Sequence, residues 1–206
     1  MKKIIFVTTI ISILSCFTAF GGDYTEVRLL SPEEYQKVNI VGIKEIETEA
    51  VEIEEVEDDS YYIEQIPLTK EEQKYIHDRW TERGYDYSLA LGFADVETGG
   101  KFNKDALNKN SHDYGLFQIN RSSWLKTMKR ELGISSMEDL FNLELNVLAA
   151  LYIYDDCTVR YGNTERAIVA YNRGFGDYAS TKYSRLVLSA QAKWQAVLDE
   201  QGYKND

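Results

Sequence analysis

Two carboxylates, Glu97 and Asp113, are the side chains of this sequence whose positions best suit acid–base chemistry. Glu97 lies near the end of an apolar segment, residues 87–98, which predicts a helix that stops at Gly99-Gly100. There the carboxyl meets the negative end of the helix dipole among apolar neighbours, so we expect its pKa to be raised. A carboxyl that stays protonated near neutral pH can act as a general acid in glycoside cleavage. The alternative is an ordinary exposed glutamate at a helix end.

Asp113 lies in the stretch SHDYGLFQIN, residues 111–120, which combines a carboxylate, an amide and a glycine with an apolar run. One interpretation is an Asx turn that leads into a bend at Tyr114-Gly115 and then into a short buried strand. The other interpretation is a substrate groove, in which Asp113 is a catalytic carboxylate or the neighbour of one. The sequence does not give the distance from Asp113 to Glu97, so both interpretations stand.

Helix signals fill most of the chain after residue 67 and predict a mainly α fold. Thr69 with Glu72, and Ser136 with Asp139, form capping boxes, and Asn120 can cap a further helix. The segment at residues 144–161 is apolar nearly all round, so we expect it to be the central buried helix. The other predicted helices cover residues 69–83, 121–132, 164–172 and 181–200, with a short β-like or loop segment near 108–119.

The net charge of the chain is concentrated before the predicted domain. Residues 23–66 hold 14 acidic residues against three basic ones, whereas residues 67–206 hold 20 against 18. Charges that repel one another are typical of a disordered, solvated tether, although Glu alternates with apolar residues between 44 and 59 as in an edge strand. Pro67 marks the expected start of the folded domain, residues 67–206. No basic surface for nucleic acid is indicated.

The first 22 residues have the pattern of an export signal. Lys2 and Lys3 precede an apolar run, and small residues follow it at Ala19 and Gly21. The run is short for a membrane span, and an uncleaved anchor is the alternative. We therefore expect an exported protein that acts in the cell envelope or outside the cell.

Cysteine and histidine are too few for a disulfide framework or a metal site. Cys16 lies inside the predicted signal, so the mature chain keeps one thiol, Cys157, which we expect to be buried in a helix. His77 and His112 are far apart, and neither a zinc-ligand spacing nor a Ser/His/Asp triad can be assembled from them. We expect chemistry without metal or cofactor.

Four segments resemble, in order and spacing, the motifs of the soluble lytic transglycosylase (SLT) family. They are ETGGKFN at 97–103, YGLFQIN at 114–120, FNLELNVLAALYIY at 141–154 and AYNRG at 170–174. Asn146 in the third segment matches an asparagine of the family. The resemblance covers roughly residues 89–176. Mild departures occur at four positions, where the family usually has Ser, Met, Pro and a small residue: Thr98, Phe117, Leu143 and Arg173.

This resemblance implies a lysozyme-like domain of the goose-type/SLT kind that cleaves peptidoglycan between N-acetylmuramic acid and N-acetylglucosamine. Glu97 would protonate the glycosidic oxygen and then accept the proton of the muramyl 6-hydroxyl, which attacks C1 and leaves a 1,6-anhydromuramyl end. Tyr171 is similar to the tyrosine that hydrogen-bonds the catalytic carboxyl. The other implied substrate-site residues are Thr98 and Gln118 at sugar substituents, Phe117 on a pyranose face, Gly115 where the backbone approaches the glycan, and Asn172 in the adjoining loop.

Two other functions remain open from the sequence. The stretch HDYGLFQIN also resembles the part of animal-type lysozymes that carries their second catalytic carboxylate, so Glu97 and Asp113 could form a muramidase that hydrolyses the bond. Retaining hydrolysis would require carboxyl groups about 5–5.5 Å apart. A non-catalytic glycan-binding protein of the same fold is the third possibility. The expected partner is the peptidoglycan glycan strand, bound by a monomer, and an envelope-spanning secretion or conjugation apparatus is a further candidate partner.

Overall fold

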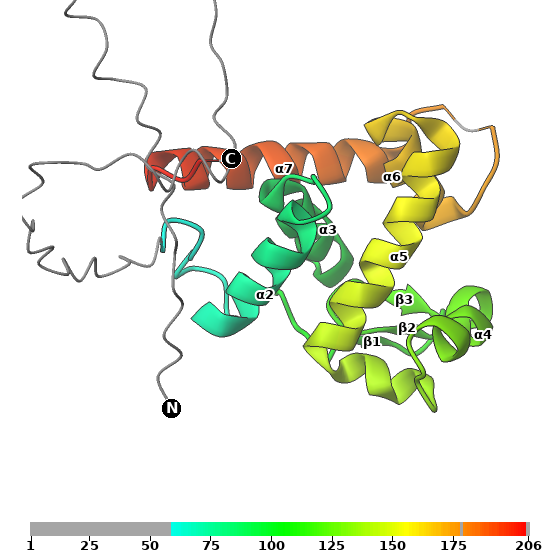
Figure 1. The fold of residues 1–206 in the computed structure, drawn as a ribbon. Coiled ribbons are helices and arrows are strands. Elements are labelled where there is room, and N and C mark those ends of the chain that lie inside the picture. The colour runs from blue at the N-terminus through cyan, green and yellow to red at the C-terminus, as the bar shows by residue number, and fades with distance from the viewer. Residues whose placement is uncertain (1–58, 178, 205–206) are drawn as a thin grey trace, which may run out of the picture. The chain divides into compact units, whose positions relative to one another are not determined.

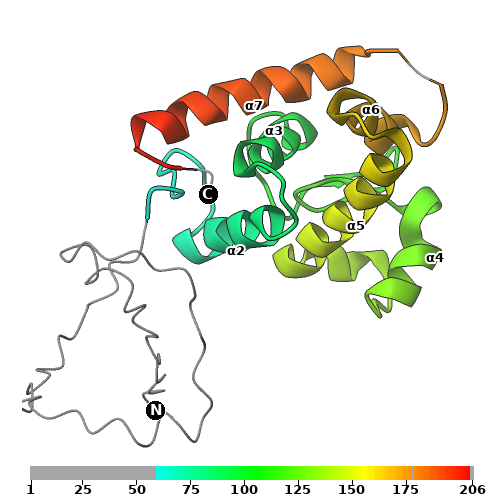
Figure 2. The same cartoon turned by 45° about the horizontal axis from the view of Figure 1, so that its top comes forward.

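The computed structural model of the chain describes residues 59–177 and 179–204, and these residues form a mainly helical domain (Figures 1 and 2). Its elements, in chain order, are α2 (Lys70–Thr81), α3 (Tyr87–Thr98), β1 (Leu107–Asn108), β2 (Asp113–Tyr114), β3 (Ile119–Asn120), α4 (Arg121–Glu131), the 3₁₀-helix η1 (Met137–Phe141), α5 (Leu143–Tyr161), α6 (Thr164–Arg173) and α7 (Lys182–Glu200). The predicted mainly α fold with a short β segment near 108–119 is confirmed.

The helix ends follow the capping chemistry of the sequence. Thr69 accepts a hydrogen bond from the Glu72 amide while the Glu72 carboxylate accepts from the Thr69 amide, which is the predicted capping box of α2. The Asn120 side chain accepts from the Ser123 amide at the start of α4. Gly99 ends α3 with a φ of 60°, a left-handed conformation that costs glycine little. Glu97 is thereby fixed in the last turn of its helix.

The three strands are only two residues long each and form one antiparallel sheet in the order β1-β2-β3. In this register Asp113 is opposite Asn108 on one side and opposite Asn120 on the other. The segment that contains the predicted groove is therefore a compact meander, and it contributes Tyr114, Leu116, Phe117 and Ile119 to the core. Its central strand places Asp113 beside the first turn of α4.

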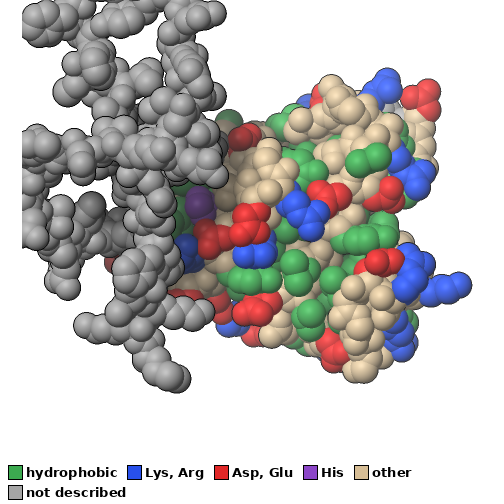
Figure 3. Space-filling model, viewed as in Figure 1, with side chains coloured by type: hydrophobic (Ala, Val, Ile, Leu, Met, Phe, Trp, Pro, Cys, Tyr) green, Lys and Arg blue, Asp and Glu red, His purple; other side chains and the backbone are tan. Residues whose placement is uncertain are grey.

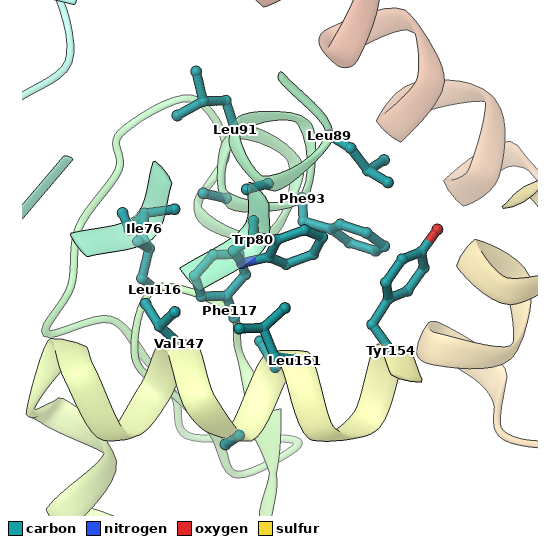
Figure 4. Packing of buried hydrophobic residues seen from close by; sticks show 14 of the residues in the cluster. Ile76, Trp80, Leu89, Leu91, Phe93, Leu116, Phe117, Val147, Leu151 and Tyr154 are labelled. Carbon is teal, nitrogen blue, oxygen red and sulfur yellow. The ribbon is translucent and has the colours of Figure 1, made fainter. Parts of the chain in front are cut away.

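The core is built around the indole of Trp80 (Figure 4). The ring centroids of Phe117 and Tyr154 lie 5.9 and 5.6 Å from it in stacked arrangements, and that of Phe93 lies 5.8 Å away. Helix α5 contributes Tyr154 and a row of further buried side chains, as expected for the central buried helix. This aromatic cluster joins α2, α3 and α5 to the loop after β2, so the segments that carry the site share one core.

Helix α7 crosses α3 at close range, and the two lie side by side in both views (Figures 1 and 2). A Cβ atom added at Gly92 of α3 would lie 2.8 Å from the Val187 carbonyl oxygen of α7. The glycine therefore sets how closely the helices approach. This approach brings the first turn of α7 towards the end of α3, where Glu97 lies.

One predicted boundary is wrong. Residues 59–66 belong to the folded domain and not to the acidic arm, because Ile63 and Ile66 are fully buried in its core and Tyr61 is nearly so. The buried side chain of Gln73 fixes this segment by accepting from the Ile63 amide at 2.9 Å and donating to the Ile63 carbonyl at 3.0 Å. The high density of acidic residues up to Asp59 hid the apolar spacing that starts at Tyr61.

The predicted export signal and the arm up to residue 58 lie outside the described residues. Within the part of the chain that the structure describes, none of the helices combines the length and the apolar character that a membrane span requires. The chain divides into two units, Met1–Glu54 and Glu55–Asp206, and the second contains every element described above.

Candidate active site

Five of the predicted site residues line one pocket of about 470 Å³: Glu97, Asp113, Gln118, Tyr171 and Asn172. Glu97 comes from the end of α3, Tyr171 and Asn172 from the last turn of α6, and the other two from the β-meander. The start of α4 also lines the pocket, with Ser123 and Trp124. Segments more than 70 residues apart in the sequence thus meet around one carboxyl group.

Glu97 is the carboxyl group with the most unusual environment in this pocket. Burial raises its pKa to about 7, against an ordinary value of 4.5, and the negative charge of Asp113 adds to this increase. The Tyr183 hydroxyl donates a 2.5 Å hydrogen bond to Glu97 Oε1, which opposes the increase by stabilising the carboxylate. Glu97 is therefore a carboxyl that changes between its protonated and ionised forms near neutral pH, as its helix-end position predicts.

Asp113 lies in the same pocket but is held by its neighbours. The Asn120 side-chain amide donates to Asp113 Oδ1 at 2.7 Å, and the Ser111 hydroxyl donates to Oδ2. Both carboxylate oxygens therefore accept hydrogen bonds from groups of the β-meander. The predicted Asx turn is not formed, because the Gly115 amide that it would use donates to the Ala106 carbonyl at 2.9 Å. Asp113 also places a negative charge near Glu97.

Three predicted substrate contacts are corrected by the structure. Phe117 cannot lie on a pyranose face, because its side chain is fully buried and stacked on Trp80. The Thr98 hydroxyl donates to the Ala94 carbonyl and accepts from the Phe102 amide, so it fixes the turn after α3. Gly115 is also buried, and its missing side chain leaves room for Asn146 and the Leu140 carbonyl rather than for glycan. Sequence spacing gave the correct segment for these residues but not the face on which each side chain lies.

The role of Tyr171 is corrected as well. Its hydroxyl donates to the Phe117 carbonyl at 3.0 Å, and the hydrogen bond to Glu97 comes from Tyr183 instead. Burial raises the pKa of both phenols well above the ordinary value, so both remain neutral donors across the physiological range. Tyr183 belongs to the first turn of α7, 86 residues after Glu97. The contact between Tyr183 and Glu97 becomes visible only from the packing of α7 on α3.

A buried asparagine holds the loop that forms the pocket floor. Asn146 of α5 accepts from the Phe117 amide at 2.8 Å and donates to the Tyr114 carbonyl at 2.9 Å. Gly115 makes this possible, since its φ is 78° and a Cβ there would lie 2.2 Å from Asn146 Nδ2. Gln118 has a φ of 47° and uses its side-chain amide to donate to the Gly115 carbonyl at 2.8 Å. Such strained conformations are common at functional sites.

Trp124 is a second residue that sequence reasoning missed. It is half-buried on α4 and lines the pocket beside Ser123. An indole at the wall of a pocket gives a flat apolar surface of the kind on which sugar rings pack. Its sequence signal was present, since a tryptophan in a helix otherwise rich in polar residues is unusual, but it did not distinguish a packing role from a binding role.

A helical domain with a small β-meander and a half-buried acid of raised pKa in a polar pocket defines a lysozyme-like protein. The family model described as the transglycosylase SLT domain matches residues 74–191, which is more than half of the chain, and the chain belongs to this family. The family acts on peptidoglycan, and the match includes every pocket residue described above. No curated protein and no solved structure matched the chain.

Proposed function

We propose that this protein is an exported lytic transglycosylase that cleaves the β-1,4 bond between N-acetylmuramic acid and N-acetylglucosamine. The observation that carries the proposal is the Glu97 carboxyl, whose pKa of about 7 leaves a large protonated fraction near neutral pH. Membership of the SLT family supplies the peptidoglycan substrate. The pocket is also large enough for more than one group of a sugar ring to contact its polar wall.

In the proposed reaction Glu97 acts twice. Its proton passes to the glycosidic oxygen as the bond from that oxygen to C1 of the muramyl residue breaks, and the sugar that leaves carries a free hydroxyl. The Glu97 carboxylate then accepts the proton of the muramyl 6-hydroxyl, and O6 bonds to C1. No water is consumed, and Glu97 ends protonated as it began. The substrate supplies the nucleophile, so a site with one titrating carboxyl suffices.

The neighbours of Glu97 have supporting roles in this scheme. Tyr183 holds the carboxyl in place and stabilises it during the interval in which it is ionised. Asp113 keeps a negative charge nearby, which favours the protonated form of Glu97 before each turnover. Trp124, Gln118 and Asn172 form the wall against which the sugars bind.

The replacement Glu97→Gln tests the proposal, because the amide is nearly isosteric and cannot donate the acid proton. We expect turnover of purified peptidoglycan to fall by at least about 1,000-fold, while binding to the glycan is retained. Glu82→Gln is the matched control, since Glu82 also ends a helix but is exposed and outside the pocket. A Glu97→Gln protein that retains more than a tenth of the activity would refute the catalytic assignment. Absence of cleavage by the unaltered protein would favour a glycan-binding function.

A two-carboxylate muramidase is the second candidate, and the presence of Asp113 in the pocket is the observation in its favour. Mass spectrometry of the released muropeptides distinguishes the two. A lytic transglycosylase leaves 1,6-anhydromuramyl ends, which are lighter by one water than the reducing ends of a hydrolase. In the first case Asp113→Asn lowers the rate by about tenfold or less, and in the second by several orders of magnitude.

Export is proposed on the signal pattern of residues 1–22, with residues 23–58 as a tether between that signal and the domain. Cell fractionation is the direct test: the protein should be found outside the cytoplasm, and substitution of Lys2 and Lys3 by Glu should retain it inside. The proteins that co-purify with it then distinguish two roles. One is remodelling of the cell wall, and the other is opening the wall for an envelope-spanning secretion or conjugation apparatus.

A further inference from the structure

A second pocket adjoins the proposed catalytic pocket on the next face of α4. It has a volume of about 630 Å³, and Arg121, Lys126 and Lys129 supply all the formally charged side chains in its lining. Ser111 and Ser122 line both pockets, so the two meet at these serines. A substrate bound across Glu97 therefore lies next to this second pocket.

The positive charge of this pocket follows from helical spacing. Arg121, Leu125 and Lys129 are four residues apart and lie on one face of α4, with Ser122 and Lys126 beside them. Among the described residues, none of the ion pairs involves any of these three cations, although Glu138 interacts electrostatically with Arg121 at longer range. Lys and Arg side chains gather over the α4 region at the right of Figure 3. A row of cations that form no direct ion pairs attracts anionic groups of a ligand.

The geometry limits which anions can reach these cations from the catalytic pocket. An α-helix rises about 1.5 Å per residue, so Lys126 and Lys129 lie about 6 and 10 Å along α4 from Ser122. An extended peptide advances about 3.3–3.6 Å per residue, so its second and third residues span the same distances. In peptidoglycan a short peptide is attached to the lactyl group of the muramyl residue, and its free carboxylates are the anionic groups nearest to the bond that is cut.

We propose that the pocket formed by Arg121, Lys126 and Lys129 binds the carboxylates of the stem peptide on the muramyl residue, so that the enzyme selects peptide-bearing strands over peptide-free strands. The inference rests on the proposed function of the Glu97 pocket and narrows its substrate. In this arrangement α4 contacts two parts of the substrate: Trp124 faces the sugars, and the cationic face of the helix binds the peptide.

The test compares kcat/KM on two preparations of the same glycan strands, one with stem peptides and one from which an amidase has removed them. For the unaltered full chain we expect a preference of about tenfold for peptide-bearing strands, equivalent to about 1.4 kcal/mol. In the double variant Lys126→Gln/Lys129→Gln this ratio should fall to within twofold of one. Arg130→Gln is the matched control, since Arg130 is on the same helix but outside the pocket and paired with Glu131, and it should keep the preference.

A binding measurement separates this inference from the proposed function. A soluble muramyl tripeptide is titrated into the unaltered chain and into the double variant by calorimetry, and the same peptide with amidated carboxylates is titrated in parallel. We expect both the double substitution and the amidation to weaken binding at least fivefold. If the chain cleaves neither strand preparation but shows this pattern, the proposed activity fails and the peptide pocket stands.

Three results would overturn the inference. One is an equal kcat/KM on the two strand preparations for the unaltered chain. Another is a preference that the double variant retains, since the cations would then not be its cause. The third is displacement of the muramyl tripeptide by inorganic phosphate at an equal concentration, which would show a general anion site without selection for the peptide.

Discussion

At the scale of single residues, Glu97 combines a function with a cost in stability. Its pKa of about 7 in the folded domain exceeds the ordinary value of 4.5, so the folded state resists ionisation of this group. The resulting contribution to stability is fully present below about pH 4.5 and is lost as the pH rises through about 7. The helix-end position among apolar neighbours predicted the raised pKa, whereas the assignment of Glu97 as the catalytic acid rested on the resemblance of the surrounding segments to the SLT motifs.

We therefore expect Glu97→Gln to stabilise the domain at pH 8, where the unaltered protein must keep an ionised carboxylate in a half-buried site. The gain should be about 1–3 kcal/mol, reduced from the full value of the pKa shift because the site is partly exposed. This corresponds to an increase in Tm of about 2–4 °C per kcal/mol. Thermal unfolding at pH 8 and at pH 4.5 measures it, and the gain should disappear at the lower pH. A gain of the same size at both values would show that ionisation is not its source.

Tyr183 is the residue that only the structure reveals, because 86 residues separate it from Glu97. Its hydrogen bond lowers the pKa of Glu97 against the effect of burial, so Tyr183→Phe should raise that pKa further. Activity that requires protonated Glu97 falls as the pH rises through this pKa. The alkaline limb of the profile of kcat/KM against pH should therefore move to higher pH in the variant.

Tyr171→Phe is the control for this prediction. It removes a hydroxyl that donates to the Phe117 carbonyl and not to Glu97, so the alkaline limb should keep its position. The free energy of unfolding should fall by about 1 kcal/mol for the lost hydrogen bond. If the two variants shift the limb equally, the direct contact of Tyr183 with the carboxyl has no special effect on its titration.

At the scale of elements, the sequence predicted helices better than it predicted the conformation of the loop that contributes Gln118 to the site. Capping residues such as Thr69 and Asn120 act within three residues of themselves, so their signals are visible in the sequence. The backbone of residues 114–117 is held instead by Asn146, which is about 30 residues away and bonds the Phe117 amide and the Tyr114 carbonyl. The predicted sugar contacts at Gly115 and Phe117 were wrong for this reason, although the segment itself was found.

The fit between Gly115 and Asn146 gives a prediction about the loop. Gly115→Ala should destabilise the domain strongly, since the added Cβ would lie 2.2 Å from Asn146 Nδ2 and 2.5 Å from the Leu140 carbonyl oxygen. Gly84→Ala is the matched control, because its φ of 74° is similar to the 78° of Gly115 but nothing lies within 4 Å of its added Cβ. The control should cost about 1–2 kcal/mol from backbone strain alone.

Unfolding in urea measures both variants on one scale. We expect Gly115→Ala to cost at least about 2 kcal/mol more than the control, because it also displaces the buried amide of Asn146, which is hydrogen-bonded at both its oxygen and its nitrogen. Equal costs would mean that Asn146 and the Leu140 carbonyl move aside easily. The loop would then not be held as the contacts of Asn146 indicate.

At the scale of the whole molecule, the position where the folded domain begins was the largest error of sequence reasoning. Composition averages over a window, and the acidic run up to Asp59 outweighed the few apolar residues that follow it. Burial depends on individual side chains, and Ile63 and Ile66 are 0% and 1% exposed. These residues close the core beside Gln73, whose buried amide has hydrogen bonds to the Ile63 and Leu68 carbonyls.

Two shortened chains place the boundary by experiment. A chain that starts at residue 59 keeps every described residue before α2, and its Tm should match that of the full chain within about 2 °C. A chain that starts at residue 67 loses two buried isoleucines, each worth about 1.5–3 kcal/mol, and leaves Gln73 without its partner at Ile63. Since whole domains are stable by only about 5–15 kcal/mol, the second chain should be largely unfolded at 37 °C and inactive. Equal melting temperatures for the two chains would show that residues 59–66 belong to the arm and not to the folded domain.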